Sequence, residues 1–181
     1  FFVAEFGAWK AGAVVVPLNP TYTERELEAA FTSTGVTIVV ALTPFYQRIK
    51  NIQARTQVRE VIATSIKEYL PAALRILFTL FKEKKDGHRI SIAAGDRWFQ
   101  DVLREHRSSP RPAVTVRSSD RAVILSSGGT TGTPKGVVGL HRDYVAAGLQ
   151  LYEWTKSAKK PWTDIIMLPL PLFHVYANVG V

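Results

Sequence analysis

A loop rich in glycine and hydroxyl residues, Ser126–Gly136, has the residue types and spacing best suited to chemistry. It reads Ser-Ser-Gly-Gly-Thr-Thr-Gly-Thr-Pro-Lys-Gly and directly follows the apolar segment Ala122–Leu125. Glycines let a backbone approach a ligand closely, so that amides, hydroxyls and one ammonium group can surround phosphate oxygens. The loop is therefore expected to bind a polyanion. The candidate binding residues are Ser127, Gly128, Gly129, Thr130, Thr131, Gly132, Thr133 and Lys135.

Two common phosphate-binding motifs do not describe this loop. In the Walker motif a Ser or Thr follows the lysine, whereas Lys135 lies between Pro134 and Gly136. The loop also lacks the G-x-G-x-x-G spacing of dinucleotide-binding proteins. A generic P-loop ATPase or GTPase is therefore disfavoured. The structural alternative is a simple turn, in which the hydroxyls of Thr130 and Thr131 bond to their own backbone.

The loop resembles the signature of the adenylate-forming enzymes, which include acyl-CoA synthetases, aryl-CoA ligases and amino-acid adenylation domains. Ser127–Gly136 matches this signature with one extra glycine, in a version similar to that of long-chain fatty acid CoA ligases. Ser126 departs from the pattern, because the family usually has an aromatic residue there. Gly12–Glu28 (GAVVVPLNPTYTERELE) and Pro169–Ala177 (PLPLFHVYA) also resemble segments of this family.

The resemblance implies ATP-dependent activation of a carboxylic acid, in particular a long-chain fatty acid, to an acyl-adenylate and then to acyl-CoA. ATP, Mg²⁺ and CoA are the implied cofactor and cosubstrates. Lys135 and the loop would hold the β and γ phosphates, and His174 would orient the substrate carboxylate. Lys135 and His174 are thus the candidate catalytic residues, and no residue is assigned to a metal. A solvated surface lysine and a satisfied core histidine are the alternatives.

The chain is expected to be an internal fragment of the family's large N-terminal domain, without ligase turnover of its own. It has 181 residues and begins at Phe1 without a methionine. Several motifs of the family would follow Val181. An aryl-CoA ligase or an amino-acid adenylation domain is the alternative within the enzyme class. A non-catalytic nucleotide- or membrane-surface-binding remnant is the alternative from another class.

The apolar pattern predicts an α/β fold with a parallel sheet flanked by helices. A helix is expected to end at Gly12, before a strand at Val14–Leu18 that is buried on both faces. Thr23–Glu26 has the form of a capping box, so a helix should run from Thr23 to Gly35, before a second buried strand at Val36–Leu42. Strand, helix and strand would form one right-handed parallel unit.

The remainder of the chain continues this alternation less regularly. Helices are expected at 45–55, 70–81, 98–104 and 142–154, with Asp143 as a cap; strands are expected at 58–63, 122–125, 137–138 and 165–168; and 169–174 should be an extended turn. The incomplete domain 1–181 is divided into an α/β unit (1–43), a basic helical stretch (44–117) and a segment with the phosphate loop and acyl pocket (118–181).

The net charge of +8 comes from the middle of the chain, since residues 44–117 hold 15 Lys and Arg against 7 Asp and Glu. Here Leu70–Phe81 is nearly apolar and is followed by Lys82, Lys84 and Lys85. A twelve-residue helix rises about 18 Å, against a hydrocarbon core of about 30 Å, so it cannot span a membrane. Two interpretations of this segment remain open: a helix packed in the core with a basic end, and an interfacial helix on anionic lipid.

Two classes of partner and site are disfavoured by composition. The basic residues lack interleaved aromatic residues and a nucleic-acid motif, so no nucleic-acid partner is expected. The absence of cysteine excludes a thiolate metal site and a cysteine nucleophile. It also fits a reducing compartment, so a cytoplasmic location is expected, with peripheral membrane contact through residues 70–85 as the interfacial alternative.

Overall fold

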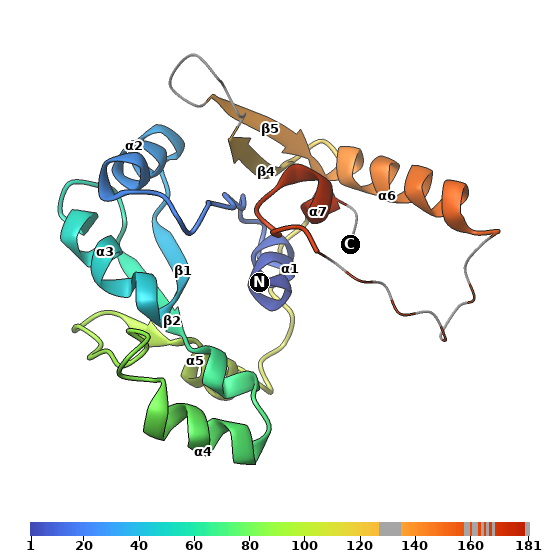
Figure 1. Cartoon of the computed structure of the whole chain (residues 1–181). Coiled ribbons are helices and arrows are strands. Elements are labelled where there is room, and N and C mark those ends of the chain that lie inside the picture. The colour runs from blue at the N-terminus through green and yellow to red at the C-terminus, as the bar shows by residue number, and fades with distance from the viewer. Residues whose placement is uncertain are drawn as a thin grey trace. The chain divides into compact units, whose positions relative to one another are not determined.

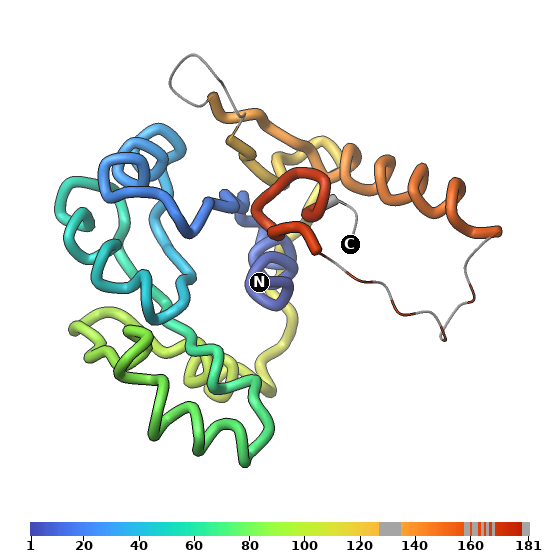
Figure 2. Tube along the Cα trace, in the orientation of Figure 1, coloured from blue at the N-terminus to red at the C-terminus, as the bar shows by residue number. Residues whose placement is uncertain are grey.

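The computed structural model describes residues 1–126, 135–157 and 169–179, together with residues 160, 163, 165 and 167. Two compact units are present (Figure 1). Pro20–Pro110 forms one, called the central unit below. Phe1–Asn19 and Arg111–Val181 form the other, called the discontinuous unit, and the backbone trace of Figure 2 shows how its two stretches are separated along the chain.

The central unit is built on a three-stranded parallel sheet. β1 (Ile38–Leu42) pairs with β2 (Glu60–Thr64), and β2 pairs with β3 (Arg97–Trp98). α3 (Thr43–Gln53) connects β1 to β2 and packs on both strands, and α5 (Phe99–Glu105) packs on β2 and β3 (Figure 1). The prediction of parallel strands flanked by helices is confirmed for this unit.

β1 differs from the predicted strand in its burial. Val36–Leu42 was expected to be covered on both faces, but Ile38, Val40 and Leu42 are 55%, 43% and 37% exposed. β1 is the edge strand of this sheet, and its exposed and half-buried residues alternate. β2 in the middle is the buried strand, with Val61, Ile62 and Ala63 in the core.

α2 (Glu24–Thr34) begins and ends where the sequence predicts. The Thr23 hydroxyl accepts the Glu26 N–H at 3.3 Å, and the Glu26 carboxylate accepts the Thr23 N–H at 2.7 Å. Gly35 ends the helix with a left-handed φ of +68°. The capping box and the glycine stop are therefore confirmed. Leu27 and Phe31 are the buried residues of this helix, which packs on α3.

α4 (Ala72–Phe81) is the predicted apolar helix, and it is preceded by the short 3₁₀ helix η1 (Ile66–Tyr69). Phe78 is the buried residue of α4, and its ring packs edge-on against the His88 ring at 5.1 Å. Other large apolar side chains of α4 are 51–70% exposed, namely Leu74, Ile76, Leu77, Leu80 and Phe81. None of the helices in the described part of the chain is long and apolar enough to cross a membrane.

The discontinuous unit contains an antiparallel hairpin, which the sequence pattern does not predict. β4 (Arg121–Ser126) pairs with β5 (Gly136–Leu140). A parallel crossover needs about a dozen or more residues, so the connection at 127–135 is too short for one. Around the hairpin lie α1 (Phe2–Lys10), α6 (His141–Thr155) and α7 (Val175–Val179).

The predicted strand at Val14–Leu18 is reduced to a single parallel bridge between Val15 and Val123. The Val15 N–H donates to Ala122 O and the Ile124 N–H to Val15 O, both at 2.9 Å. Pro17 has no N–H and cannot extend this ladder. The expected pairing with the strand at 36–42 is wrong, because that strand pairs with β2.

The chain turn after α1 needs a glycine. Gly12 has a φ of +75°, and a Cβ on it would lie 2.7 Å from the Val114 Cγ1. A side chain at this position would therefore strain the backbone and clash with Val114.

The predicted helix at 142–154 is confirmed as α6, and the Asp143 carboxylate accepts the Leu140 N–H at 2.9 Å near its start. The strand predicted at 165–168 lies partly outside the described residues. Ile165 and Met167 are described, and neither belongs to a strand. Residues 170–174 form bends and turns, and the short helix α7 after them was not predicted.

Candidate functional site

The β4–β5 hairpin brings the two ends of the glycine-rich loop together. The last register pair of the hairpin joins Ser126 to Gly136, and the exposed Lys135 immediately precedes β5. The predicted phosphate-binding residues Ser127, Gly128, Gly129, Thr130, Thr131, Gly132 and Thr133 lie outside the described residues. The described geometry thus places Lys135 at the mouth of the hairpin from which the loop extends.

The mouth of the hairpin is closely packed. A Cβ on Gly136 would lie 2.9 Å from the Ile124 Cγ2 on the facing strand. Since ordinary Cβ contacts are longer, a side chain at Gly136 would force the Ile124 side chain or the strand backbone to shift next to Lys135. The glycine after the lysine therefore has a packing role as well as a place in the motif.

His174 lies in the turn that leads into α7. Its backbone N–H donates to Pro171 O at 2.9 Å, and its carbonyl accepts the Asn178 N–H at 2.9 Å. The residue is exposed, and its Nδ1 lies 3.4 Å from the Tyr176 N–H. An exposed imidazole on a hydrogen-bonded turn is available to orient a ligand.

A buried polar cluster that the motifs do not predict contacts this turn. Asn178 of α7 donates to the Glu5 Oε1 of α1 at 2.8 Å and accepts the Tyr144 hydroxyl of α6. Glu5 and Asn178 are 4% and 6% exposed. The signal that could have revealed the cluster is Glu5 itself, a carboxylate within the otherwise apolar run Phe1–Trp9.

Burial controls the protonation of this cluster. Desolvation raises the pKa of Glu5 above its ordinary value, and the hydrogen bond from Asn178 offsets only part of that effect. Burial, followed by the nearby Glu5 carboxylate, raises the pKa of Tyr144 to about 12. Tyr144 therefore keeps its proton at neutral pH and acts as the donor to Asn178.

Trp9 connects the same cluster to the hairpin. Its indole N–H donates to the carbonyl of Ala122 in β4 at 2.8 Å. Its ring packs edge-on against Tyr144 at 5.3 Å and against His141 at 5.9 Å. The turn with His174 and the hairpin with Lys135 thus share one set of supporting contacts within the discontinuous unit.

A shallow groove of about 280 Å³ runs along the start of α6 and is lined by Ser118, His141, Arg142, Val145, Ala146 and Leu149. Neither candidate catalytic residue lines it. The backbone N–H groups of His141 and Arg142 donate to Asp120 O and Ser118 O. These two residues therefore fix the start of α6.

No group of three or more His, Asp or Glu that could hold a metal ion occurs among the described residues. A metal that arrives on a ligand's phosphates needs no such group, because phosphate oxygens and waters complete its coordination.

Comparison with known proteins relates this chain to one family. The sequence profile of the family described as AMP-binding enzyme matches residues 1–181. The chain is 30% identical over 179 residues to a long-chain-fatty-acid–CoA ligase of Yersinia pestis. It is 28% identical over 180 residues to a protein of the same name from Bacillus subtilis (strain 168).

These alignments cover 97% and 99% of this chain, but 31% and 32% of the two relatives. The chain therefore spans about a third of the length of the curated relatives it matches. Among solved structures, a long-chain-fatty-acid-CoA ligase from Archaeoglobus fulgidus superposes with a TM-score of 0.72 at 24% identity, over 98% of this chain and 29% of that one. That likeness shows a shared fold.

Proposed function

Because the chain belongs to the AMP-binding enzyme family, we propose that it forms part of an ATP-dependent acyl-CoA synthetase that activates a long-chain fatty acid. The observation that carries this proposal is the β4–β5 hairpin, which brings the ends of the phosphate-type loop together next to Lys135. The fatty acid is favoured over other acids because the relatives from Yersinia pestis and Bacillus subtilis are named long-chain-fatty-acid–CoA ligases.

The proposed reaction has two steps. A carboxylate oxygen of the acid attacks the α-phosphorus of ATP, the α–β phosphoanhydride bond breaks, and pyrophosphate leaves. The sulfur of CoA then attacks the acyl carbonyl, the thiol gives up its proton, and AMP leaves. Negative charge builds on the departing pyrophosphate in the first step, so a fixed cation and backbone amides at that position lower the barrier.

Lys135 is proposed to supply that cation, together with the amides and hydroxyls of residues 127–133. Mg²⁺ would enter on the phosphates of ATP, since it prefers phosphate oxygens and water as ligands. His174 is proposed to orient the carboxylate of the acid, because the turn before α7 fixes its backbone and leaves the residue exposed.

The isolated chain of 181 residues is expected to show no acid-dependent exchange of pyrophosphate into ATP. The chain corresponds to about a third of the length of the relatives. Site residues that lie in the other two thirds of those proteins have no counterpart in the isolated chain. Acid-dependent exchange by the isolated chain would contradict this expectation.

Pyrophosphate exchange by the full-length protein tests the proposed activity. Palmitate should support exchange, whereas coumarate and the amino acids should support little. Exchange with coumarate alone would assign an aryl-CoA ligase, and exchange with one amino acid would assign an adenylation domain. No exchange with any of these acids, in a folded protein that binds ATP, would favour the non-catalytic remnant.

Membrane contact through α4 is a second proposal, carried by the exposed apolar side chains of that helix. Phe78 anchors α4, while Ile76, Leu80 and Phe81 are 61–70% exposed. The exposed Lys82, Lys84 and Lys85 follow directly. Apolar side chains next to several cations suit the interface of an anionic bilayer, where burial and charge attraction act together. A long-chain fatty acid would be available at the same interface.

Flotation with liposomes tests this surface. The full-length protein should float with phosphatidylcholine–phosphatidylserine vesicles and much less with phosphatidylcholine vesicles. Leu80→Glu should abolish flotation, whereas Leu103→Glu, at a 40% exposed site on α5, should not. Equal flotation of all three proteins would overturn the proposal.

A further inference from the structure

Asn178 uses every polar atom of its side chain in the buried cluster. Its amide nitrogen donates to the Glu5 Oε1 at 2.8 Å and to Leu172 O at 3.3 Å, and its oxygen accepts the Tyr144 hydroxyl. A buried polar group left without a partner is costly. Few positions of α7 satisfy all three contacts at once, so the cluster specifies where α7 lies.

Asn178 also makes hydrogen bonds to the residues before and after Phe173. Its side chain binds the carbonyl of Leu172, and its backbone N–H binds the carbonyl of His174 at 2.9 Å. The turn is closed on the other side by the bond from the His174 N–H to Pro171 O. Asn178 therefore fixes the backbone from which the His174 imidazole extends. Asn178 itself is buried, whereas His174 is exposed.

The other end of the cluster reaches the hairpin. Tyr144 lies in the first turns of α6, which begins directly after β5, and its ring packs against Trp9. Trp9 in turn donates to Ala122 of β4. A continuous set of contacts therefore links the turn with His174 to both strands that flank Lys135.

We propose that Asn178 is a positioning residue for the adenylation step, holding His174 in place relative to the phosphate-binding hairpin through Glu5 and Tyr144. This inference rests on the proposed function, because it assigns a task to His174. Small displacements of an orienting group slow a reaction strongly, since the reacting atoms must lie within about 3–3.5 Å in the correct direction.

The composition of the cluster favours positioning over plain stabilisation. In the part of the chain that the structure describes, the salt bridges do not include Glu5, and Asn178 is its hydrogen-bond donor. Burial of a carboxylate outside any salt bridge costs free energy, whereas its direction-dependent hydrogen bond fixes geometry. Burial raises the pKa of Glu5, which reflects the free-energy cost of burying its charge.

A double-mutant cycle in the full-length protein separates positioning from loss of folding. Asn178→Ala should lower kcat for palmitate-dependent pyrophosphate exchange about tenfold, with KM for ATP unchanged. In the His174→Ala background the same change should have no further effect, because both variants remove one function. If Asn178 only stabilised the fold, Asn178→Ala would lower the exchange rate by the same factor in the wild-type protein and in the His174→Ala variant.

Two further variants keep the test decisive. Tyr144→Phe retains the ring packing and removes one hydrogen bond to Asn178, so it should slow exchange several-fold with the same dependence on His174. Asn51→Ala is the matched control, because Asn51 donates to Glu24 at 2.7 Å at an exposed site in the central unit. It should leave the rate unchanged.

Each outcome has a distinct meaning. Additive losses from Asn178→Ala and His174→Ala, or an unchanged rate in both Asn178→Ala and Tyr144→Phe, would overturn the positioning role while the proposed function stands. An unaffected His174→Ala variant would overturn both the role of His174 and this inference. Absence of exchange with every acid would refute the proposed function itself.

Discussion

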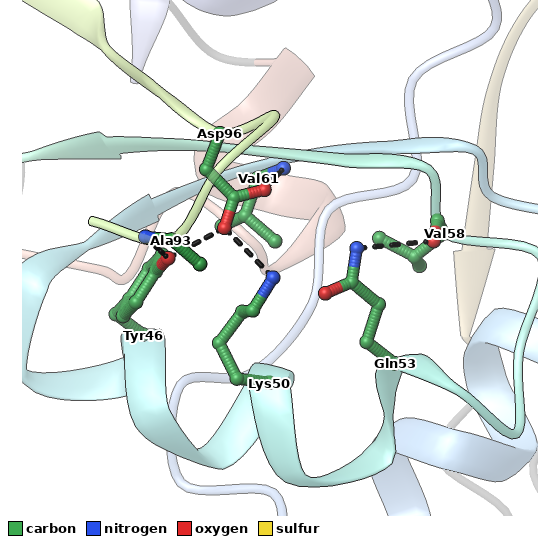
Figure 3. A network of polar contacts seen from close by, with 7 residues as sticks. All are labelled: Tyr46, Lys50, Gln53, Val58, Val61, Ala93 and Asp96. Atoms are coloured by element: carbon green, nitrogen blue, oxygen red, sulfur yellow. Dashed lines mark hydrogen bonds and ion pairs between the residues drawn. The ribbon is translucent and has the colours of Figure 1, made fainter.

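The two units each bury a carboxylate in a polar cluster, but the two clusters are built differently. In the central unit the Asp96 side chain is 1% exposed and accepts from the Lys50 ammonium at 2.8 Å, the Val61 N–H at 2.9 Å and the Tyr46 hydroxyl (Figure 3). In the discontinuous unit Glu5 accepts from Asn178 and makes no salt bridge among the described residues, although the Phe1 ammonium exerts a smaller favourable charge effect on it.

The pKa values follow this difference. Burial raises the pKa of Asp96, but the hydrogen bonds from Lys50, Tyr46 and Val61 outweigh it, so its pKa lies below the ordinary value. Burial dominates at Glu5 and raises its pKa. The Asp96 cluster, which contains the Lys50 cation, stabilises the central unit. The Glu5 cluster instead lowers the stability of the discontinuous unit, and through Asn178 it contacts the turn that carries His174.

Asp96→Ala should have the largest effect on stability. It leaves the Lys50 ammonium, the Tyr46 hydroxyl and the Val61 N–H without their acceptor, and removing one partner of a buried ion pair costs about 3 kcal/mol. Denaturant unfolding should show this loss, and hydrogen exchange should place it at the β2 amides. Asp101→Ala is the control, because the Asp101–Arg104 pair is exposed and should contribute less than about 0.5 kcal/mol.

Glu5→Gln should have a smaller effect of opposite sign. The glutamine oxygen can still accept from Asn178, while the buried charge is removed, so the free energy of unfolding at pH 7 should rise by about 1 kcal/mol. A lower stability of this variant would mean that the Glu5 charge is paired more favourably than the described contacts show.

The pH dependence should give the smallest differences, with opposite signs in the two units. A lowered pKa at Asp96 stabilises the fold fully above pH 3.8, the ordinary value, and that contribution is lost as pH falls through the folded-state pKa. A raised pKa at Glu5 gives a contribution that is present below pH 4.5 and lost as pH rises through the folded-state pKa.

Unfolding curves between pH 3 and 7 check both signs. The gain in Glu5→Gln should grow with rising pH, and the loss in Asp96→Asn should also grow with rising pH, each by about 1.4 kcal/mol for every pH unit between the unfolded-state and folded-state pKa values. Curves for either variant that stay parallel to the wild-type curve would contradict the corresponding assignment.

Local features of the fold and the parallel α/β class of the central unit were predictable from the sequence, whereas the particular partner of each strand was not. The capping box at Thr23 and the stop at Gly35 involve neighbouring residues and were confirmed. The exposure of β1 and the pairing of Val15 depend on which strands lie alongside. The sequence pattern alone does not specify those partners.

The candidate site divides in the same way. Lys135 and His174 were named from motifs, and their roles remain proposals. The contact between Glu5 and Asn178 joins residues 173 positions apart, so no local spacing could have predicted it. Only the unusual carboxylate in an apolar helix pointed to a buried partner.

The most direct test of the account compares two lysines, one in each unit. Lys135→Ala in the full-length protein should reduce palmitate-dependent pyrophosphate exchange about 100-fold, the scale of losing one charge-stabilising group, with an unchanged Tm. Lys50→Met should lower Tm through the loss of its bond to Asp96, with an unchanged exchange rate at a temperature where it is folded. An unchanged exchange rate in Lys135→Ala would contradict the central claim that the β4–β5 hairpin holds the phosphates of ATP.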